Sequence, residues 1–185
     1  KVGIIGDTGS GKTTLINLIS GLLEPSSGNI LINSKQIAPL QEYPLDAGYV
    51  SQSVYLTDDS ILFNIALSKK IPKIKIDLIK NLLKVLNLNN LKNLNHRLGE
   101  RGSKMSGGQI QRIGIARALY RNPSLLILDE ATNALDQKTE IKILNHIFKK
   151  FNNKIVILCT HKTKLLKYCN KIIKVKDAKI SILKN

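Results

Sequence analysis

Short apolar runs alternate with amphipathic helical patterns along most of the chain. Runs typical of buried strands lie at residues 1–6, 29–32, 48–51, 125–129, 155–159, 172–175 and 180–183. Between them, residues 12–22 and 137–151 repeat apolar side chains three and four positions apart, as one face of a helix requires. Several strand runs are continuously apolar, which is typical of a mostly parallel sheet with helices on both faces. The pattern therefore predicts an α/β fold.

The middle of the chain departs from this alternation. Residues 53–95 contain no convincing strand, but helix-like segments occur at 60–67 and 74–86, and the helical pattern IQRIGIARALYRN follows at 110–122. We expect a helical subdomain over about residues 53–122, inserted in one α/β core. The sequence opens on Lys1 and runs directly into a strand, so we expect residues 1–185 to be one domain of a longer polypeptide.

Composition narrows the class of protein. Apolar residues make up 43% of the chain and charged residues 23%, which excludes a disordered chain, and no apolar run approaches the roughly 18 residues that cross a bilayer. The net charge is +16, but the eleven lysines after residue 147 are scattered among Ile, Leu and Asn rather than interleaved with aromatic residues. We therefore expect no specific nucleic-acid partner. Cys159 and Cys169 lack metal-ligand spacing and are interpreted as inert thiols.

A glycine-rich octapeptide, GDTGSGKT, follows the first strand and opens the first helix at residues 6–13. It fits the pattern GxxxxGK[ST], whose glycines let backbone N–H groups curl around phosphates. Lys12 supplies a cation to the β- and γ-phosphate oxygens, and the Thr13 hydroxyl is a ligand for Mg²⁺. The sequence therefore predicts a nucleotide phosphate site, whose members are Asp7, Thr8, Gly9, Ser10, Gly11, Lys12, Thr13 and Thr14.

Two carboxylates end the most apolar strand, LLILD at residues 125–129. Asp129 is placed to hold the metal of the phosphate site, because a P-loop needs a second oxygen ligand at the end of a neighbouring buried strand. Glu130 follows at once, where a carboxylate can orient or deprotonate a water that attacks the γ-phosphate. We interpret Asp129 as a metal ligand and Glu130 as the general base.

A second glycine-rich helix start lies at SGGQ, residues 106–109. Ser106 is a natural N-cap, and the glycines expose backbone donors that form an anion site. A single nucleotide needs only one such cradle. The second therefore serves a nucleotide held by another copy, unless it is only a flexible cap.

With these motifs the sequence resembles the ATP-binding cassette (ABC) ATPases over essentially all of its length. Six motifs occur in the order and spacing of that family. They are the Walker A motif at 6–13, the Q-loop glutamine Gln52, the signature motif at 105–109 with Met105 in place of the usual Leu, the Walker B strand at 125–129 with Glu130, the D-loop at 134–136 and the switch histidine His161. In three other places the chain departs from the common pattern, at His96, Ile110 and Asn133.

The resemblance implies a P-loop core that binds ATP and Mg²⁺ and works as a head-to-tail dimer. Each ATP would lie between the Walker A motif of one subunit and the Ser106, Gly108 and Gln109 of the other. Gln52 would join the Mg²⁺ ligands and sense the γ-phosphate. His161 would hold the γ-phosphate and the attacking water, and Asp136 would link the two sites.

The stretch LGERG at residues 98–102 resembles the x-loop of exporter-type cassettes. It implies an ATPase domain that powers export or flipping at the cytoplasmic face of a membrane, the bacterial inner membrane, through a transmembrane domain N-terminal on the same chain. Two alternatives stay open: a soluble cassette ATPase that acts on nucleic acid or ribosomes, and the ATPase subunit of an importer. The transported substrate is not readable from these residues.

Overall fold

The structure is a computed structural model that describes residues 1–32, 34–36, 46–70 and 74–184. The backbone divides into two compact units. Unit 1 comprises Lys1–Tyr49, Ser124–Asp129 and Ile155–Asn185, and unit 2 comprises Val50–Pro123 and Glu130–Lys154.

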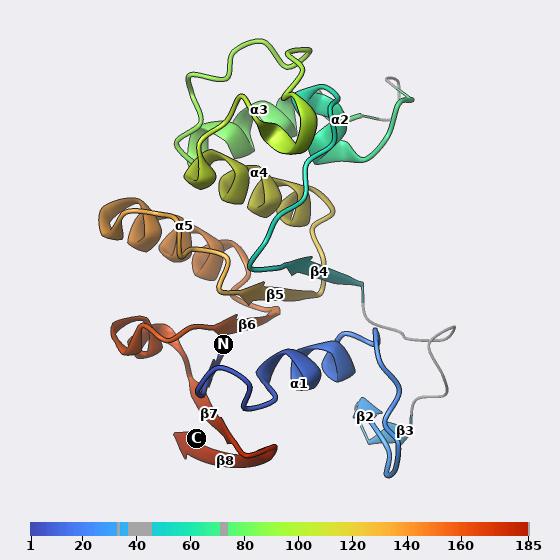
Figure 1. Cartoon of the computed structure of the whole chain (residues 1–185), viewed down its shortest axis with the longest axis vertical. Coiled ribbons are helices and arrows are strands. Elements are labelled where there is room, and N and C mark those ends of the chain that lie inside the picture. The colour runs from blue at the N-terminus through green and yellow to red at the C-terminus, as the bar shows by residue number, and fades with distance from the viewer. Residues whose placement is uncertain (33, 37–45, 71–73, 185) are drawn as a thin grey trace. The chain divides into compact units, whose positions relative to one another are not determined.

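A six-stranded sheet forms unit 1, in the order β4-β5-β6-β1-β7-β8 (Figure 1). Its strands are β1 (Val2–Ile5), β4 (Ala47–Val50), β5 (Leu125–Asp129), β6 (Ile155–Cys159), β7 (Lys171–Lys176) and β8 (Lys179–Lys184). β5, β6, β1 and β7 pair in parallel, and β8 runs antiparallel to β7. The predicted α/β fold with a mostly parallel sheet is confirmed.

The core of unit 1 is built from the strands that the apolar runs predict. Ile4, Leu125, Ile127 and Ile157 pack with Ile16 of helix α1 (Lys12–Ile19). The predicted helix at 12–22 ends at Ile19, three residues early. Its C-cap N–H bonds back to the Ile16 carbonyl, and the glycine at residue 21 then turns the backbone at φ 73°, a common way to end a helix.

A short antiparallel ribbon, β2 (Leu31–Ile32) with β3 (Lys35–Gln36), accompanies the sheet. The predicted strand at 29–32 is therefore half as long as expected, and the sequence pattern did not predict β3.

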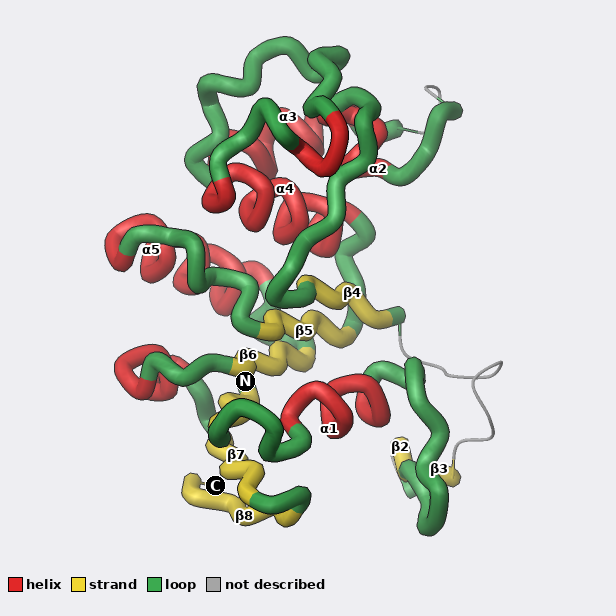
Figure 2. The backbone as a smooth tube through the Cα atoms, viewed as in Figure 1, coloured by secondary structure: helices red, strands yellow, loops and turns green. Residues whose placement is uncertain are grey.

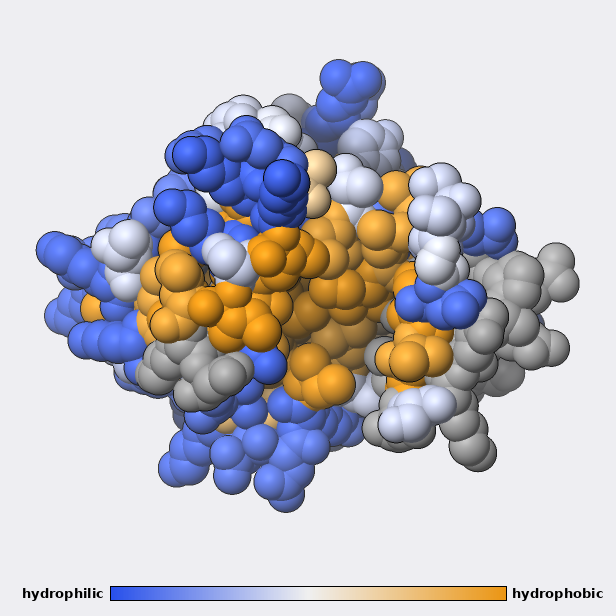
Figure 3. Space-filling model, turned by 90° about the horizontal axis from the view of Figure 1, so that it is seen from below, coloured by the Kyte–Doolittle hydropathy of each residue, from blue (hydrophilic) through white to orange (hydrophobic). Residues whose placement is uncertain are grey.

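Unit 1 also leaves apolar side chains in solvent: Leu31, Ile180 and Ile182 are 60%, 56% and 53% exposed. Figure 3 shows apolar residues gathered on the face seen from below. An edge strand with exposed isoleucines is a surface that proteins usually cover.

Unit 2 is helical (Figure 2). Its α-helices are α2 (Ile61–Ala66), α3 (Ile76–Val85), α4 (Gly107–Tyr120) and α5 (Gln137–Lys150). Each was predicted, with its ends at most three residues from the observed ones. α2 and α3 both pack against α4, and α3 contributes Ile79, Leu82 and Leu83 as its buried face. Within the described ranges, every helix is too short or too polar to cross a bilayer.

Candidate active site

The phosphate loop connects β1 to α1 in unit 1. Its backbone takes left-handed conformations at Gly9 and Gly11, with φ 79° and 103°, which side chains other than glycine adopt only with strain. At Gly6 the space for a side chain is the constraint, since a Cβ there would collide with the Val175 carbonyl oxygen of β7. The glycines predicted for a phosphate cradle are therefore each required by the loop.

Two polar groups of this loop have the properties of a phosphate site. Lys12 is 8% exposed, and its Nζ donates to the carbonyl oxygens of Gly6 and Asp7 at 2.8 and 2.7 Å. The Ser10 hydroxyl is buried and lacks a hydrogen-bond partner among the described residues. A buried hydroxyl and ammonium at the start of a helix fit an anion with several acceptor oxygens. The nucleotide phosphates that the sequence predicts are such a group.

The register of the sheet brings three predicted site segments to one edge. In the parallel ladders, Cys159 of β6 pairs with Ile4 on one side and with Asp129 on the other. The carboxyl ends of these strands are therefore level, and ligands of open α/β sheets bind at that edge. The phosphate loop, Asp129 and His161 follow these ends. The Thr160 N–H, directly before His161, donates to the Ile4 carbonyl at 3.2 Å.

Asp129 is held by a residue that the motif analysis missed. It is 8% exposed, and its Oδ2 accepts a hydrogen bond of 3.1 Å from the Tyr49 hydroxyl of β4. Burial raises the pKa of Tyr49 to about 12, with the negative charge of Asp129 as the second cause. Tyr49 therefore stays a proton donor to this carboxylate at neutral pH.

Replacement of Tyr49 tests this contact. In Tyr49→Phe the mostly buried Asp129 loses a donor, so we expect the free energy of unfolding to fall by about 1 kcal/mol at pH 8. Because folding raises the pKa of Tyr49, the wild type should lose stability as the pH rises from about 10, the unfolded value, to about 12. The variant should lack this component. Urea unfolding at several pH values measures both effects, and equal curves for the two proteins would exclude the contact.

Glu130 begins the second segment of unit 2 and has an unusual backbone conformation. Its φ is 51°, in the left-handed region, and the residue is 8% exposed. The Asn133 amide Nδ2 donates to Glu130 Oε2 at 2.9 Å, and the Asn133 N–H donates to the Glu130 carbonyl at 3.2 Å. Such conformations are concentrated at functional sites, where surrounding contacts hold them.

The signature segment begins helix α4, with Ser106 as the N-cap that the sequence predicts. Ser106 Oγ accepts from the Gln109 N–H at 3.3 Å, and Gln109 Oε1 accepts from the Ser106 N–H at 2.9 Å, which is a complete capping box. The Ser106 hydroxyl proton is not used by this cap. Gly108 allows close packing, because a Cβ there would lie 3.1 Å from the Ala134 carbonyl oxygen.

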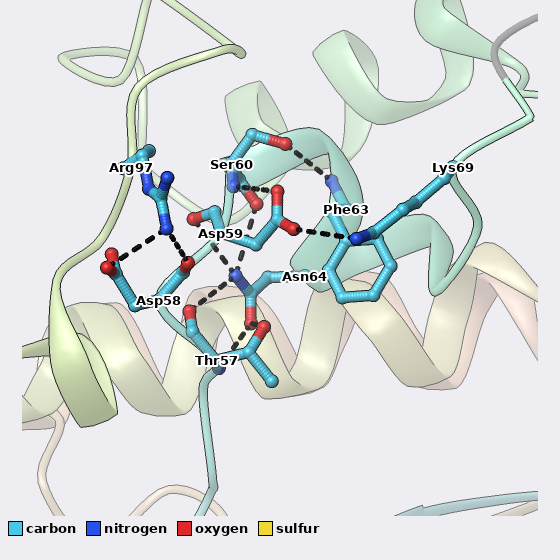
Figure 4. A network of polar contacts seen from close by, with 8 residues as sticks. All are labelled: Thr57, Asp58, Asp59, Ser60, Phe63, Asn64, Lys69 and Arg97. Carbon is cyan, nitrogen blue, oxygen red and sulfur yellow. Dashed lines mark hydrogen bonds and ion pairs between the residues drawn. The ribbon is translucent and has the colours of Figure 1, made fainter.

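Gln52 lies exposed in the loop after β4. The residues that follow it are held by side-chain hydrogen bonds. Asn64, fully buried, donates from Nδ2 to the Thr57 carbonyl at 3.1 Å and accepts at Oδ1 from the Thr57 N–H at 3.0 Å (Figure 4). The Asp58 carboxylate accepts from Arg97 Nη2 and from the Gly99 N–H, both at 3.1 Å. The segment after Gln52 is thus tied to the residues just before the signature motif.

The predicted residues fall into two groups. Unit 1 carries the phosphate loop, Asp129 and His161, whereas unit 2 carries Gln52, Glu130 and the signature segment at 106–109. Asp136 caps α5 by accepting from the Thr139 N–H at 3.0 Å, and this hydrogen bond lowers the pKa of its carboxyl. The sequence reasoning did not single out Tyr49, Asn64 or Gln111. Their signal was weak, since Tyr49 is an ordinary strand residue and Asn64 and Gln111 are ordinary helix residues.

The loop, strand ends and helix start define a P-loop nucleotide-binding domain. Comparison with known proteins specifies it further. The profile described as ABC transporter matches residues 1–133. The chain belongs to the ABC transporter family, and it is an ATP-binding ATPase domain of that family.

Its relatives include exporters. The ATP-dependent lipid A-core flippase of Neisseria meningitidis is 35% identical over 97% of this chain and 30% of its own length. The ABC transporter ATM1 of Toxoplasma gondii is 35% identical over 98% of this chain and 16% of its own. A bacterial Atm1-family ABC exporter with ATP bound matches 97% of the chain and 33% of its own, with a TM-score of 0.88 and 29% identity. The chain thus spans a third or less of these proteins.

Proposed function

We propose that the chain is the ATP-hydrolysing domain of an exporter-type membrane transporter. It would power export or flipping through a transmembrane domain N-terminal on the same polypeptide, at the cytoplasmic face of the bacterial inner membrane. The observation that carries the proposal is the phosphate loop. Its Lys12 is buried, and its buried Ser10 hydroxyl lacks a hydrogen-bond partner among the described residues. The loop lies at the same edge of the sheet as Asp129 and His161. The likeness to exporters over 97% of the chain supports the transport role.

In this proposal the loop residues 7–14 bind the ATP phosphates, with Lys12 as their cation. Mg²⁺ would be held by the Thr13 hydroxyl, the Asp129 carboxylate and the Gln52 amide oxygen. Thr13 is exposed, and Tyr49 orients Asp129. One carboxylate and two neutral oxygen donors fit Mg²⁺, which binds through one or two carboxylates and keeps phosphate oxygens and water in its shell. The cation supplies charge neutralisation on the phosphates.

Hydrolysis would then depend on the residues that orient and deprotonate the attacking water. Glu130 accepts its proton, because it is the carboxylate next along the chain from Asp129. His161 holds the γ-phosphate and orients the water. Gln52 reports the presence of the γ-phosphate to the helical subdomain, proposed at about 53–122.

The second cradle is proposed to act in trans. Ser106, Gly108 and Gln109 would close on the γ-phosphate of a nucleotide bound to the partner subunit in a head-to-tail dimer. The N-terminus of α4, a helix of 14 residues, adds its dipole to this contact. Asp136, in the loop that contacts α4, would link the two ATP sites.

Ser106→Arg tests this arrangement. If Ser106 only caps its helix, the variant should lose about 1 kcal/mol of stability and keep its ATPase activity. We expect instead that it binds ATP on its own phosphate loop, with an unchanged Kd, but neither dimerises nor hydrolyses ATP. Equilibrium ATP binding and size-exclusion chromatography with ATP and Mg²⁺ measure both. A dimeric, fully active variant would contradict the proposal.

Two other functions are weighed against the exporter. The net charge of +16 favours a soluble cassette ATPase that acts on nucleic acid or ribosomes, but only about ninety residues separate Thr13 from Ser106, too few for the long coiled coil of chromosome-structuring cassettes. GERG at 99–102 disfavours an importer subunit. The sequence upstream separates these functions: about six apolar stretches of roughly 20 residues support the exporter, and a second cassette contradicts it.

A further inference from the structure

Helix α4 is hydrogen-bonded to the loop that follows Glu130. Gln111 lies one turn beyond the glycines of the signature segment, is 7% exposed, and accepts at Oε1 from the Ala134 N–H at 2.9 Å. A Cβ on Gly108 would lie 3.1 Å from the Ala134 carbonyl oxygen and 3.6 Å from Leu135 Cδ2. The loop at 134–135 therefore packs directly on the first turn of α4, at van der Waals distance and with one fixed hydrogen bond.

The same loop holds the carboxylate of Glu130. Asn133, the neighbour of Ala134 in the chain, donates from Nδ2 to Glu130 Oε2 at 2.9 Å. The backbone between them is a tight turn, closed by the Asn133 N–H on the Glu130 carbonyl and by the Leu135 N–H on the Thr132 carbonyl, at 3.2 and 3.1 Å. The side chain that holds Glu130 therefore belongs to the same hydrogen-bonded turn as Ala134.

We propose that Gln111 and Asn133 are positioning residues that make the orientation of Glu130 depend on the first turn of α4. The hydrogen bonds from Gln111 to Ala134 and from Asn133 to Glu130 are called the α4–Glu130 bridge. The inference rests on the proposed function. When Ser106 and Gly108 contact the nucleotide of the partner subunit, the bridge orients Glu130 of their own subunit. ATP bound at one site therefore promotes hydrolysis at the other.

The chemistry of the step explains why orientation matters. A general base acts only within hydrogen-bond reach of the proton it accepts, and small misplacements cost rate. The Asn133 amide fixes one carboxylate oxygen, Oε2, and thereby the orientation of the carboxylate. Asn133 stands where the family commonly has serine, whose shorter side chain carries a hydroxyl in place of this amide.

If the bridge orients Glu130, breaking either of its two hydrogen bonds should lower kcat as much as breaking both. On the full-length protein, Asn133→Leu and Gln111→Met should each lower kcat about tenfold, the effect of one hydrogen bond to a charged or buried group, with the Kd for ATP unchanged. The double variant should lose about the same tenfold, because either break already uncouples Glu130. Lys142→Met, which removes the 2.8 Å bond from α5 to Asn87, is the matched control and should keep kcat.

Melting temperatures show whether the variants fold. If Gln111→Met unfolds, Gln111→Asn replaces it, since it keeps the amide but falls short of Ala134. Losses that multiply to about a hundredfold in the double variant, or single variants with unchanged kcat, would overturn the bridge. If Glu130→Gln itself hydrolyses ATP normally, the proposed role of Glu130 fails instead.

Discussion

Glu130→Gln is expected to bind ATP as the wild type does and to hydrolyse it at least about 100-fold more slowly, the usual contribution of a general base. The amide has nearly the same shape as the carboxylate and can still hydrogen-bond, but it has lost the basicity that takes a proton from water. Since ATP stays bound, the variant should accumulate as a dimer in ATP and Mg²⁺. Steady-state ATPase rates and size-exclusion chromatography measure these two effects.

The control for this variant is Asp77→Asn, which makes the same change of a carboxylate to an amide on the exposed face of α3, where Asp77 lies 3.8 Å from Lys80. It should keep the wild-type rate. If Glu130→Gln kept it too, the general base would have to be another group.

Lys12→Ala should weaken ATP binding roughly 10- to 100-fold and abolish measurable turnover. Lys12 is the only side-chain cation of the phosphate loop sequence, and its two bonds to the Gly6 and Asp7 carbonyls also hold that loop in shape. Binding of a fluorescent ATP analogue and ATPase assays provide the measurement. Lys138→Ala, at the exposed start of α5, removes the same charge elsewhere and should leave both unchanged. Near-normal turnover of Lys12→Ala would exclude the loop as the ATP site.

The strands and helices of the core were predictable because their patterns are local. The strands at 125–129 and 155–159 have the bounds that their apolar runs predict, and Ser106 is the cap that its position before a helical pattern indicates. The end of α1 was predicted too late. The apolar spacing continues to Leu22, whereas the turn at Gly21 decides where the helix stops.

The contacts that hold the candidate site were not predictable. Tyr49 and Asp129 are 80 residues apart, and Asp58 and Arg97 are 39 apart, so their hydrogen bonds depend on which strands and loops become neighbours. Gln111 looked like one more polar residue of a helix. The residues proposed to bind phosphate are glycines and a lysine at fixed spacing, which the sequence shows directly. Residues that hydrogen-bond to the site segments, such as Tyr49 and Gln111, follow no spacing of their own.

ATP is proposed to be hydrolysed at a site composed of the phosphate loop of one subunit and the signature segment of its partner. Mixing Ser106→Arg with Lys12→Ala subunits tests it most directly, because the mixture builds one intact site from the phosphate loop of the first variant and the signature of the second. ATP-dependent dimer and part of the ATPase activity should return in the mixture, although each variant alone lacks them. No recovery in the mixture, together with full activity of Ser106→Arg alone, would contradict the head-to-tail site.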